Sequence, residues 1–251
     1  MSGVDRLFDV KNLFFLGQYQ QCILEAQKLN TKVEEEKIAK EVFMYRSYIA
    51  QGKASLVLNE ISEHTLPSVC NIYILQNPED AMRILSKSDS LEAHSATVFT
   101  LLQMDRVDLA AKELKKMNDI DEDATLTQLA LAWVNMTVGK DKLNDAYYIY
   151  QEMMDKYGQS PKLLICQSAV LILQGKYKDA EALLHVFQEA QLRDANNCEA
   201  LVNLVALSQF LGKDNEVMKR YISQLRDINP NHPWVIDLKA KENLFDELVA
   251  A

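Results

Sequence analysis

The stretch LQGKYKDAEALL, residues 173–184, contains the pattern that decides the fold. It has a glycine, an aromatic residue two positions later, a small residue three positions after that, and an apolar residue one helical turn further on. FLGQYQQCILEA, residues 15–26, follows the same order. The pattern is typical of a helical hairpin, because glycine ends the first helix in a left-handed conformation and the small residue lets the second helix cross the first closely.

The same frame fits the chain at seven places. The small position falls at Cys22, Val57, Ala81, Ala110, Ala146, Ala180 and Val217. Five residues earlier stand Gly17, Gly52, Gln76, Asp105, Asp141, Gly175 and Gly212, and four residues later stand Ala26, Ile61, Leu85, Leu114, Tyr150, Leu184 and Tyr221. Four of the six spacings between small positions are 34 to 37 residues, close to the period of tetratricopeptide repeats. The sequence therefore predicts an all-α fold, a tetratricopeptide-like α-solenoid of helical hairpins.

The spacing also predicts how the array is organised. We expect a single solenoid over residues 1–251, with an irregular, truncated joint near residues 62–80, where Pro67 and Pro78 leave little room for a helix. We expect a C-terminal capping helix with Pro233 in its first turn. Its apolar residues are mixed with Lys and Glu, as in a terminal cap with a polar outer face; they are Ile236, Leu244, Phe245 and Leu248.

Composition limits the partners. The 27 Lys and Arg residues against 36 Asp and Glu give a net charge of -9, which disfavours direct binding to nucleic acid or to an anionic membrane. The four cysteines are far apart with no CxxC pair, as in a cytosolic protein with reduced thiols. No apolar run approaches the roughly 20 residues that span a bilayer. We expect a cytoplasmic protein without direct membrane insertion.

The acidic stretch DIDEDATLTQLALAWV, residues 119–134, resembles the start of a calcium loop. Such a loop needs glycine at its sixth position and glutamate at its twelfth, and alanine stands at both. The apolar residues that follow fall on one helical stripe. We therefore predict the start of a helix, with a capping box of Thr125 and Gln128 or a cap by Asp123, and with the acids stabilising the helix dipole.

Catalytic and cofactor motifs are absent from the sequence. The four histidines stand alone, and there is no HExxH, GxGxxG, GxxxxGK[ST] or GxSxG pattern. We predict a protein that is not an enzyme and has no metal, cofactor or small-molecule substrate. Three classes remain: a scaffold subunit of a larger assembly, a tetratricopeptide co-chaperone or adaptor that binds a peptide in its groove, and a helical enzyme without a recognisable motif.

The first expected helix favours the scaffold. A co-chaperone clamps a terminal carboxylate with Lys and Asn on its groove face. VDRLFDVKNLFFLG, residues 4–17, offers only Lys11 and Asn12, beside two phenylalanines. An aromatic groove suits a permanent apolar partner better than a charged peptide.

Long stretches of the chain closely resemble the epsilon subunit family of coatomer. They are LFDVKNLFFLGQYQQCILEAQ, DLAAKELKKMNDIDEDATLTQLALAWV, LNDAYYIYQEM, ALVNLVALSQFLGK, RYISQL and AKENLFDEL. The resemblance covers about Val4 to Ile61 and Asn71 to Val249. Family members have a further helical stretch between the positions of Ile61 and Asn71, so this chain resembles a shortened form.

The resemblance implies a structural subunit of the coatomer (COPI) vesicle coat, active in Golgi-to-ER retrograde and intra-Golgi transport. It implies a tetratricopeptide-like ring that binds the C-terminal region of the alpha coatomer subunit, together with the rest of the coatomer complex. It also implies a cytoplasmic protein that is peripheral on Golgi membranes and on COPI-coated vesicles.

Repeat phase suggests which residues face the groove. The positions in first helices are Arg46, Asn203, Gln209 and Phe210. We expect these four to bind the partner, although core packing is an equal alternative for Phe210 and surface solvation for Arg46.

Overall fold

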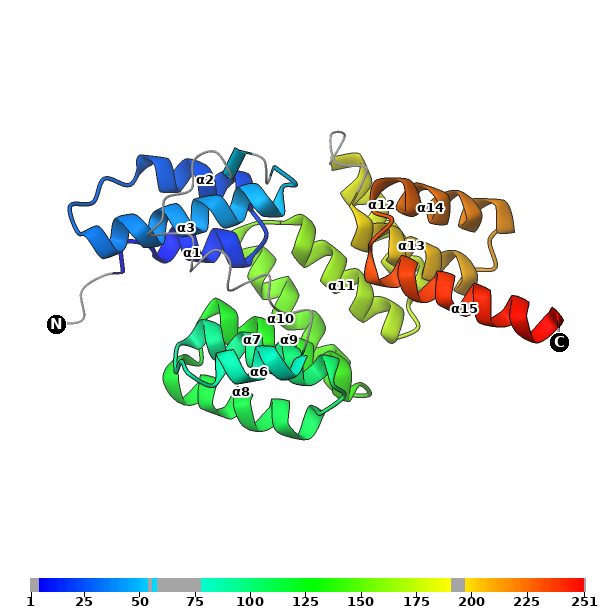
Figure 1. Ribbon diagram of the computed structural model, residues 1–251, viewed down its shortest axis with the longest axis horizontal. Helices are drawn as coiled ribbons and strands as arrows, with labels where there is room; N and C mark the ends of the chain where they lie inside the picture. Colours follow the sequence, from blue (N-terminus) through cyan, green and yellow to red (C-terminus); the bar gives the residue numbers. More distant parts are fainter. Residues whose placement is uncertain (1–4, 54–55, 58–77, 191–196, 251) are drawn as a thin grey trace. The chain divides into compact units, whose positions relative to one another are not determined.

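The computed structural model describes residues 5–53, 56–57, 78–190 and 197–250. These residues form thirteen α-helices and no strand (Figure 1). The prediction of an all-α fold built from helical hairpins is confirmed. Hairpins are formed by α1 with α2, α7 with α8, α9 with α10, and α13 with α14.

The contacts divide the chain into two compact units, residues 1–163 and 164–251. The first unit contains α1 (Phe8–Phe15), α2 (Tyr19–Lys28), α3 (Glu34–Ala50), α6 (Pro78–Leu85), α7 (Leu91–Gln103), α8 (Val107–Asp121), α9 (Thr125–Val138) and α10 (Lys142–Tyr157). The unit boundary falls inside α11 (Pro161–Leu173), and the second unit continues with α12 (Tyr177–Ala190), α13 (Cys198–Phe210), α14 (Asn215–Ile228) and α15 (Pro233–Ala250). The single array over residues 1–251 stays a prediction.

The small positions of the repeat frame lie where the helices cross. Cys22, Ala110, Ala146 and Ala180 are completely buried, near the start of α2, α8, α10 and α12 respectively. Val217 is the exception, since it is partly exposed in α14. A small, buried side chain at these positions lets two helix backbones approach closely.

At five described positions the residue that stands five places before the small residue has the left-handed conformation that the frame predicts. Gly17, Gly52, Gly175 and Gly212 have positive φ, and so does Asp105. Gln76 lies outside the described residues.

Asp141 was predicted as a sixth left-handed position, and this is wrong, because its φ is -64°. The turn between α9 and α10 places its two left-handed residues earlier, at Gly139 and Lys140. Asp141 therefore precedes α10 in a helical conformation.

The predicted truncated joint near residues 62–80 falls almost entirely within residues 58–77, which the structure does not describe. The chain is described again from Pro78, where α6 begins. Helix α6 packs against α7. Ala81, the small position of the repeat frame in α6, is buried, so the frame holds in the helix that follows the predicted joint.

The start of α9 differs from the predicted capping box. Ala124 is the N-cap residue, and no side chain, including that of Asp123, caps the helix. Thr125 is already helical, and its hydroxyl donates instead to Asn12 Oδ1 at 2.8 Å. The Gln128 amide donates to a carbonyl oxygen of the preceding turn. The predicted cap is wrong because a tertiary contact with α1 takes the threonine hydroxyl.

The acids before α9 were predicted to stabilise its dipole, and this too is wrong for the first of them. Helix α8 ends at Asp121, so Asp119 and Asp121 lie in its last turn. That is the negative end of the α8 dipole, where carboxylates are disfavoured. Asp121 instead accepts a hydrogen bond from the backbone N–H of Asp123, at 3.1 Å, in the turn.

The N-terminal hairpin also contacts helices far along the chain. In a regular solenoid each repeat touches only its neighbours. Here the end of α1 meets the start of α9 and the turn between α10 and α11. The hydrogen bonds are Thr125 Oγ1 to Asn12 Oδ1 (2.8 Å), Gln18 Nε2 to the Tyr157 carbonyl (3.2 Å), Ser160 Oγ to the Leu16 carbonyl (2.5 Å) and Lys162 Nζ to the Phe15 carbonyl (3.0 Å).

A partly buried ion-pair cluster joins α7 to α8. Glu113 lies 2.5 Å from Nδ1 of His94 and 2.8 Å from Nζ of Lys116. Burial alone would raise the pKa of Glu113, but hydrogen bonds from Lys116 and His94 outweigh it and hold this pKa below its ordinary value. The ionised carboxylate therefore stabilises the folded state.

This cluster predicts a pH dependence. A carboxyl with a lowered folded-state pKa contributes stability that is complete above its ordinary pKa of 4.5 and is lost as the pH falls through the folded-state value. We expect Glu113→Gln to reduce the difference in unfolding free energy between about pH 7 and about pH 3, measured by urea titration. Glu122→Gln, at an exposed position after α8, is the control. An unchanged difference in Glu113→Gln would contradict the expectation.

The last helix begins as predicted at Pro233. Its first turns pack inward through Val235, which is 5% exposed. The predicted polar outer face is wrong, because the four apolar residues assigned to the cap are all at least 55% exposed; they are Ile236, Leu244, Phe245 and Leu248. Among the helices of the described chain, none combines the length and the apolar character that crossing a bilayer requires.

Candidate protein-binding surfaces

Exposed apolar side chains occupy the same place in two successive hairpins of the second unit. Leu173 is the last residue of α11 and is 54% exposed, and Phe210 is the last residue of α13 and is 56% exposed. Tyr177, at the start of α12, stacks on Phe210 with the ring planes 2° apart and the centroids at 4.7 Å. Gln209 is also exposed. We call Tyr177, Gln209 and Phe210 the tip patch.

The turn glycines explain why these residues come to equivalent places. Gly175 and Gly212 both have positive φ, which a residue without Cβ adopts without strain. After each glycine the next backbone N–H donates back into the helix, from Lys176 to the Leu171 carbonyl and from Lys213 to the Ser208 carbonyl, both at 2.9 Å. Leu173 and Phe210, each two positions before its glycine, therefore end their helices in front of the same type of turn.

An ion pair holds the α12 side of the patch. The Lys213 ammonium, from the turn after α13, donates to the carboxylate of Glu181 in α12. This hydrogen bond lowers the pKa of Glu181. Because it ties α12 to the turn beyond Phe210, it helps to keep the Tyr177 ring against the Phe210 ring.

Two of the four sequence-predicted partner residues lie together in this patch. Phe210 and Gln209 are adjacent and exposed, so core packing does not account for Phe210. Asn203 is on the same helix but is partly buried, and its Nδ2 donates to the Ile165 carbonyl at 3.3 Å and to Ser168 Oγ at 3.0 Å. Asn203 thus joins α13 to α11 within the unit.

Arg46 belongs to the first unit, and its surroundings are not those of a solvated surface residue. Its side chain is 12% exposed and forms a 2.6 Å ion pair with Glu92. The guanidinium lies over the rings of Phe14 and Phe43, at 4.5 and 5.0 Å from their centroids. Cation–π contacts of this kind fix α3 against α1. A role of these four residues in partner binding stays a prediction.

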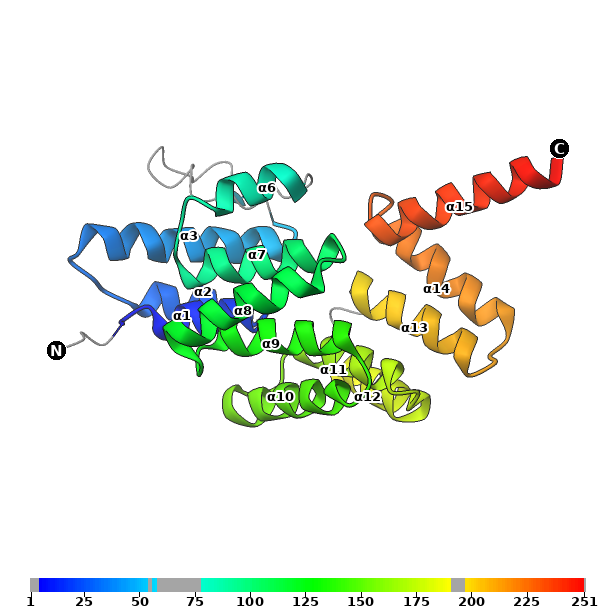
Figure 2. The same ribbon diagram turned by 90° about the horizontal axis from the view of Figure 1, so that it is seen from below.

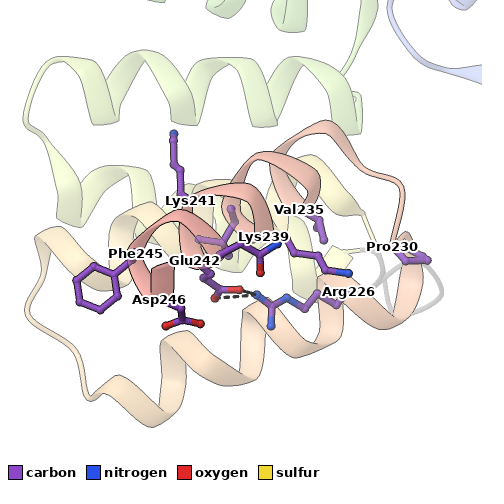
Figure 3. A pocket seen from close by; sticks show the side chains of 10 residues that line it. Arg226, Pro230, Val235, Lys239, Lys241, Glu242, Phe245 and Asp246 are labelled. Carbon is purple, nitrogen blue, oxygen red and sulfur yellow. Dashed lines mark hydrogen bonds and ion pairs between the residues drawn. The ribbon is translucent and has the colours of Figure 1, made fainter. Parts of the chain in front are cut away.

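A second surface lies between α14 and α15, where a pocket of about 830 Å³ opens (Figure 3). Arg226 of α14 and Glu242 of α15 meet in it through two hydrogen bonds of 2.9 and 2.7 Å. Phe245 lies at the other end of the pocket from Pro230 in this view. The exposed apolar side chains of Leu244, Leu248 and Val249 continue along α15. Sequence reasoning missed this surface, although the spacing of residues 244, 245, 248 and 249 is that of one helix face.

Two features of the described residues concern metals and thiols. No group of three or more His, Cys, Asp or Glu among them could hold a metal ion. Burial raises the pKa of the Cys22 thiol, although a hydrogen bond from Ser47 and the charge of Arg46 oppose this. Cys22 Sγ also donates to the Val10 carbonyl. A thiol of this kind is a poor nucleophile.

Comparison with known proteins identifies the family. The family model described as "Coatomer epsilon subunit" matches residues 3–77 and 69–251. Coatomer subunit epsilon of Caenorhabditis elegans is 40% identical over 98% of this chain and 98% of its own length. Coatomer subunit epsilon of Dictyostelium discoideum (96% of this chain, 97% of its own) and coatomer subunit epsilon-1 of Arabidopsis thaliana (98% and 97%) are each 30% identical.

The alignments also bear on the shortened region. The match with the Caenorhabditis elegans protein spans 289 positions, whereas this chain has 251 residues, so that relative has residues without a counterpart here. The family model matches in two pieces that overlap at residues 69–77, beside the stretch predicted to be missing. On both sides of this point the match extends through nearly all of the chain, and the protein belongs to the coatomer epsilon subunit family.

Proposed function

We propose that this member of the family binds the C-terminal region of the alpha coatomer subunit through the tip patch. As a coatomer (COPI) subunit it is a structural component of a vesicle coat. The proposal adds that it is non-catalytic, that it is cytoplasmic and peripheral on Golgi membranes, and that it supports Golgi-to-ER retrograde and intra-Golgi transport. The observation that carries the binding proposal is the exposed ring of Phe210, which stacks on the partly buried ring of Tyr177.

The tip patch has the features of an interface hot spot. Aromatic side chains are enriched at the centres of protein interfaces, where they bury a large area for few rotatable bonds. The stacked rings are held in place before a partner arrives, which reduces the entropy lost on binding. Lys176 and Lys178 flank Tyr177 in the sequence and Lys213 follows Phe210 by three residues, so charged residues are available for the polar rim of an interface.

The alternative of a peptide-clamping co-chaperone has less support. Lys11 forms a 2.7 Å ion pair with Asp5, and Asn12 is 8% exposed with its Oδ1 already bonded to Thr125. The Lys11 ammonium is already paired within the first unit, and the pocket that Asn12 lines also carries the carboxylates of Asp9 and Glu25, which would repel a terminal carboxylate.

The proposal predicts the effect of one truncation. Phe210→Ala removes the exposed ring of the stacked pair, and hot-spot truncations of this kind cost about 2 kcal/mol, or roughly a 30-fold rise in Kd. The measurement is isothermal titration of the intact chain with the C-terminal region of the alpha coatomer subunit. Phe8→Ala is the matched control, because Phe8 is 52% exposed on α1 and should leave the Kd unchanged.

Two outcomes would count against the tip patch. If Phe245→Ala weakens binding and Phe210→Ala does not, the α14–α15 surface is the binding site instead. If the unaltered chain does not bind the alpha subunit but recovers chaperones from cytosol, the co-chaperone alternative gains and the scaffold proposal fails.

A further inference from the structure

A second pocket, of about 310 Å³, lies in the first unit. Its walls come from α1, α2 and the end of α10. The lining residues are Asp9, Asn12, Leu13, Leu16, Gln21, Leu24, Glu25 and Tyr157. This pocket shares no residue with the tip patch or with the α14–α15 surface. The volume falls at the lower end of the range for small-ligand sites, enough for one large side chain and its backbone.

Asn12, one of the residues that line this pocket, has an unpaired side-chain donor. Asn12 is more than nine-tenths buried, and its Oδ1 accepts the hydrogen bond from Thr125. Its Nδ2 is buried and has no hydrogen-bond partner among the described residues. A buried donor without an acceptor costs about 1–3 kcal/mol, so a ligand that supplies a carbonyl oxygen here would recover that energy.

The charged residues that line the pocket are all acidic. Two carboxylates line it, from Asp9 of α1 and Glu25 of α2, and none of its eight lining residues is a lysine or an arginine. Glu25 forms an exposed ion pair with Lys28 through Oε1, a contact that contributes little in water. Asp9 forms no ion pair with any described residue. The side chain of Leu24 is 46% exposed and adds an apolar surface at the same site.

We propose that this pocket binds an arginine of a partner protein chain. The guanidinium lies against Asp9 and Glu25, where its planar set of five donors can serve two carboxylates at once. The aliphatic stem covers Leu13 and Leu24. When the buried Asn12 amide turns toward the pocket, the backbone carbonyl of the arginine or its neighbour accepts from Nδ2. An ammonium would serve two carboxylates less well, because it is a compact point charge.

The site is tested on the intact chain with N-acetyl-arginine methylamide, a probe that contains one guanidinium and two peptide carbonyls. The expected result in ¹H–¹⁵N spectra is a saturable shift of the Asn12 side-chain NH₂ signal and of backbone signals of α1 and α2. The citrulline analogue has the same shape without the charge, and we expect it to bind roughly tenfold more weakly. Glu25→Gln should weaken binding of the arginine probe by a similar factor.

The control is Glu35→Gln, which removes one exposed carboxylate from α3 and should leave the titration unchanged. Equal shifts with the arginine and citrulline probes would overturn the proposal, and so would an arginine titration that Glu25→Gln does not alter. The alpha coatomer subunit is absent from this experiment, so its result is separate from the test of the tip patch.

Discussion

Replacing Tyr150 by alanine is expected to lower the free energy of unfolding of the first unit by about 3–5 kcal/mol. Tyr150 is fully buried in α10, one turn after Ala146, and its hydroxyl lies 3.5 Å from the sulfur of Met136 in α9. Its ring fills the space that the small residue opens between the two helices. Removing the ring leaves a cavity that the crossing of α9 and α10 cannot close without moving a helix.

The measurement is urea unfolding followed by Trp133 fluorescence, since Trp133 lies in α9 of the same unit. Tyr148→Ala is the matched control, because Tyr148 is on the same helix and is 68% exposed. It should cost less than about 1 kcal/mol, although it loses an edge contact with Tyr147. Equal losses in the two variants would show that the repeat frame does not define the core.

Replacing Gly17 by alanine is expected to cost about 3 kcal/mol. Gly17 has a φ of +80°, where an added Cβ costs roughly 1–2 kcal/mol. The new Cβ would also lie 2.8 Å from Cβ of Lys162. Lys162 cannot easily withdraw, because that atom adjoins the backbone and its ammonium is bonded to the Phe15 carbonyl. Relief of this overlap adds about 1–3 kcal/mol and loosens α1 from the start of α11.

Gly52→Ala is the matched control for this prediction. Gly52 has nearly the same φ, +75°, but no atom lies within 4 Å of the Cβ that would be added. It should cost only the backbone term, roughly 1–2 kcal/mol. The difference between the two variants in urea unfolding isolates the contact with Lys162. If the two losses are the same, the N-terminal hairpin does not dock on residues 157–162 in solution.

The hairpins were largely predictable from the sequence because their determinants are local. A glycine at positive φ, a small residue at a helix crossing and an apolar residue one turn later all act within about ten residues. Ala110, Ala146 and Ala180 are fully buried as the frame requires. The C-terminal helix starting at Pro233 was predictable for the same reason, since proline fits the first turn of a helix.

The candidate sites were predictable only in part. Gln209 and Phe210 lie together and exposed, because a helix end and its turn set both positions. Arg46 and Asn203 were assigned to the same surface by repeat phase, but both side chains bond to neighbouring helices. The position of a residue within the repeat predicts on which side of its helix the side chain lies. It does not predict which other helix packs against that side.

By itself, the sequence determined the helical hairpins, their order and the coatomer epsilon family. The hairpins depend on local periodicity, and the family is identified by long stretches of similar sequence. Only the tertiary structure decided that Thr125 bonds to Asn12 instead of capping α9, and that Lys162 packs on Gly17. It also decided that α15 exposes its apolar residues and that Asn12, which lines a pocket, has a side-chain donor with no partner in the described part of the chain. The contacts of Thr125 with Asn12 and of Lys162 with Gly17 join residues more than 100 positions apart, and no local pattern encodes them.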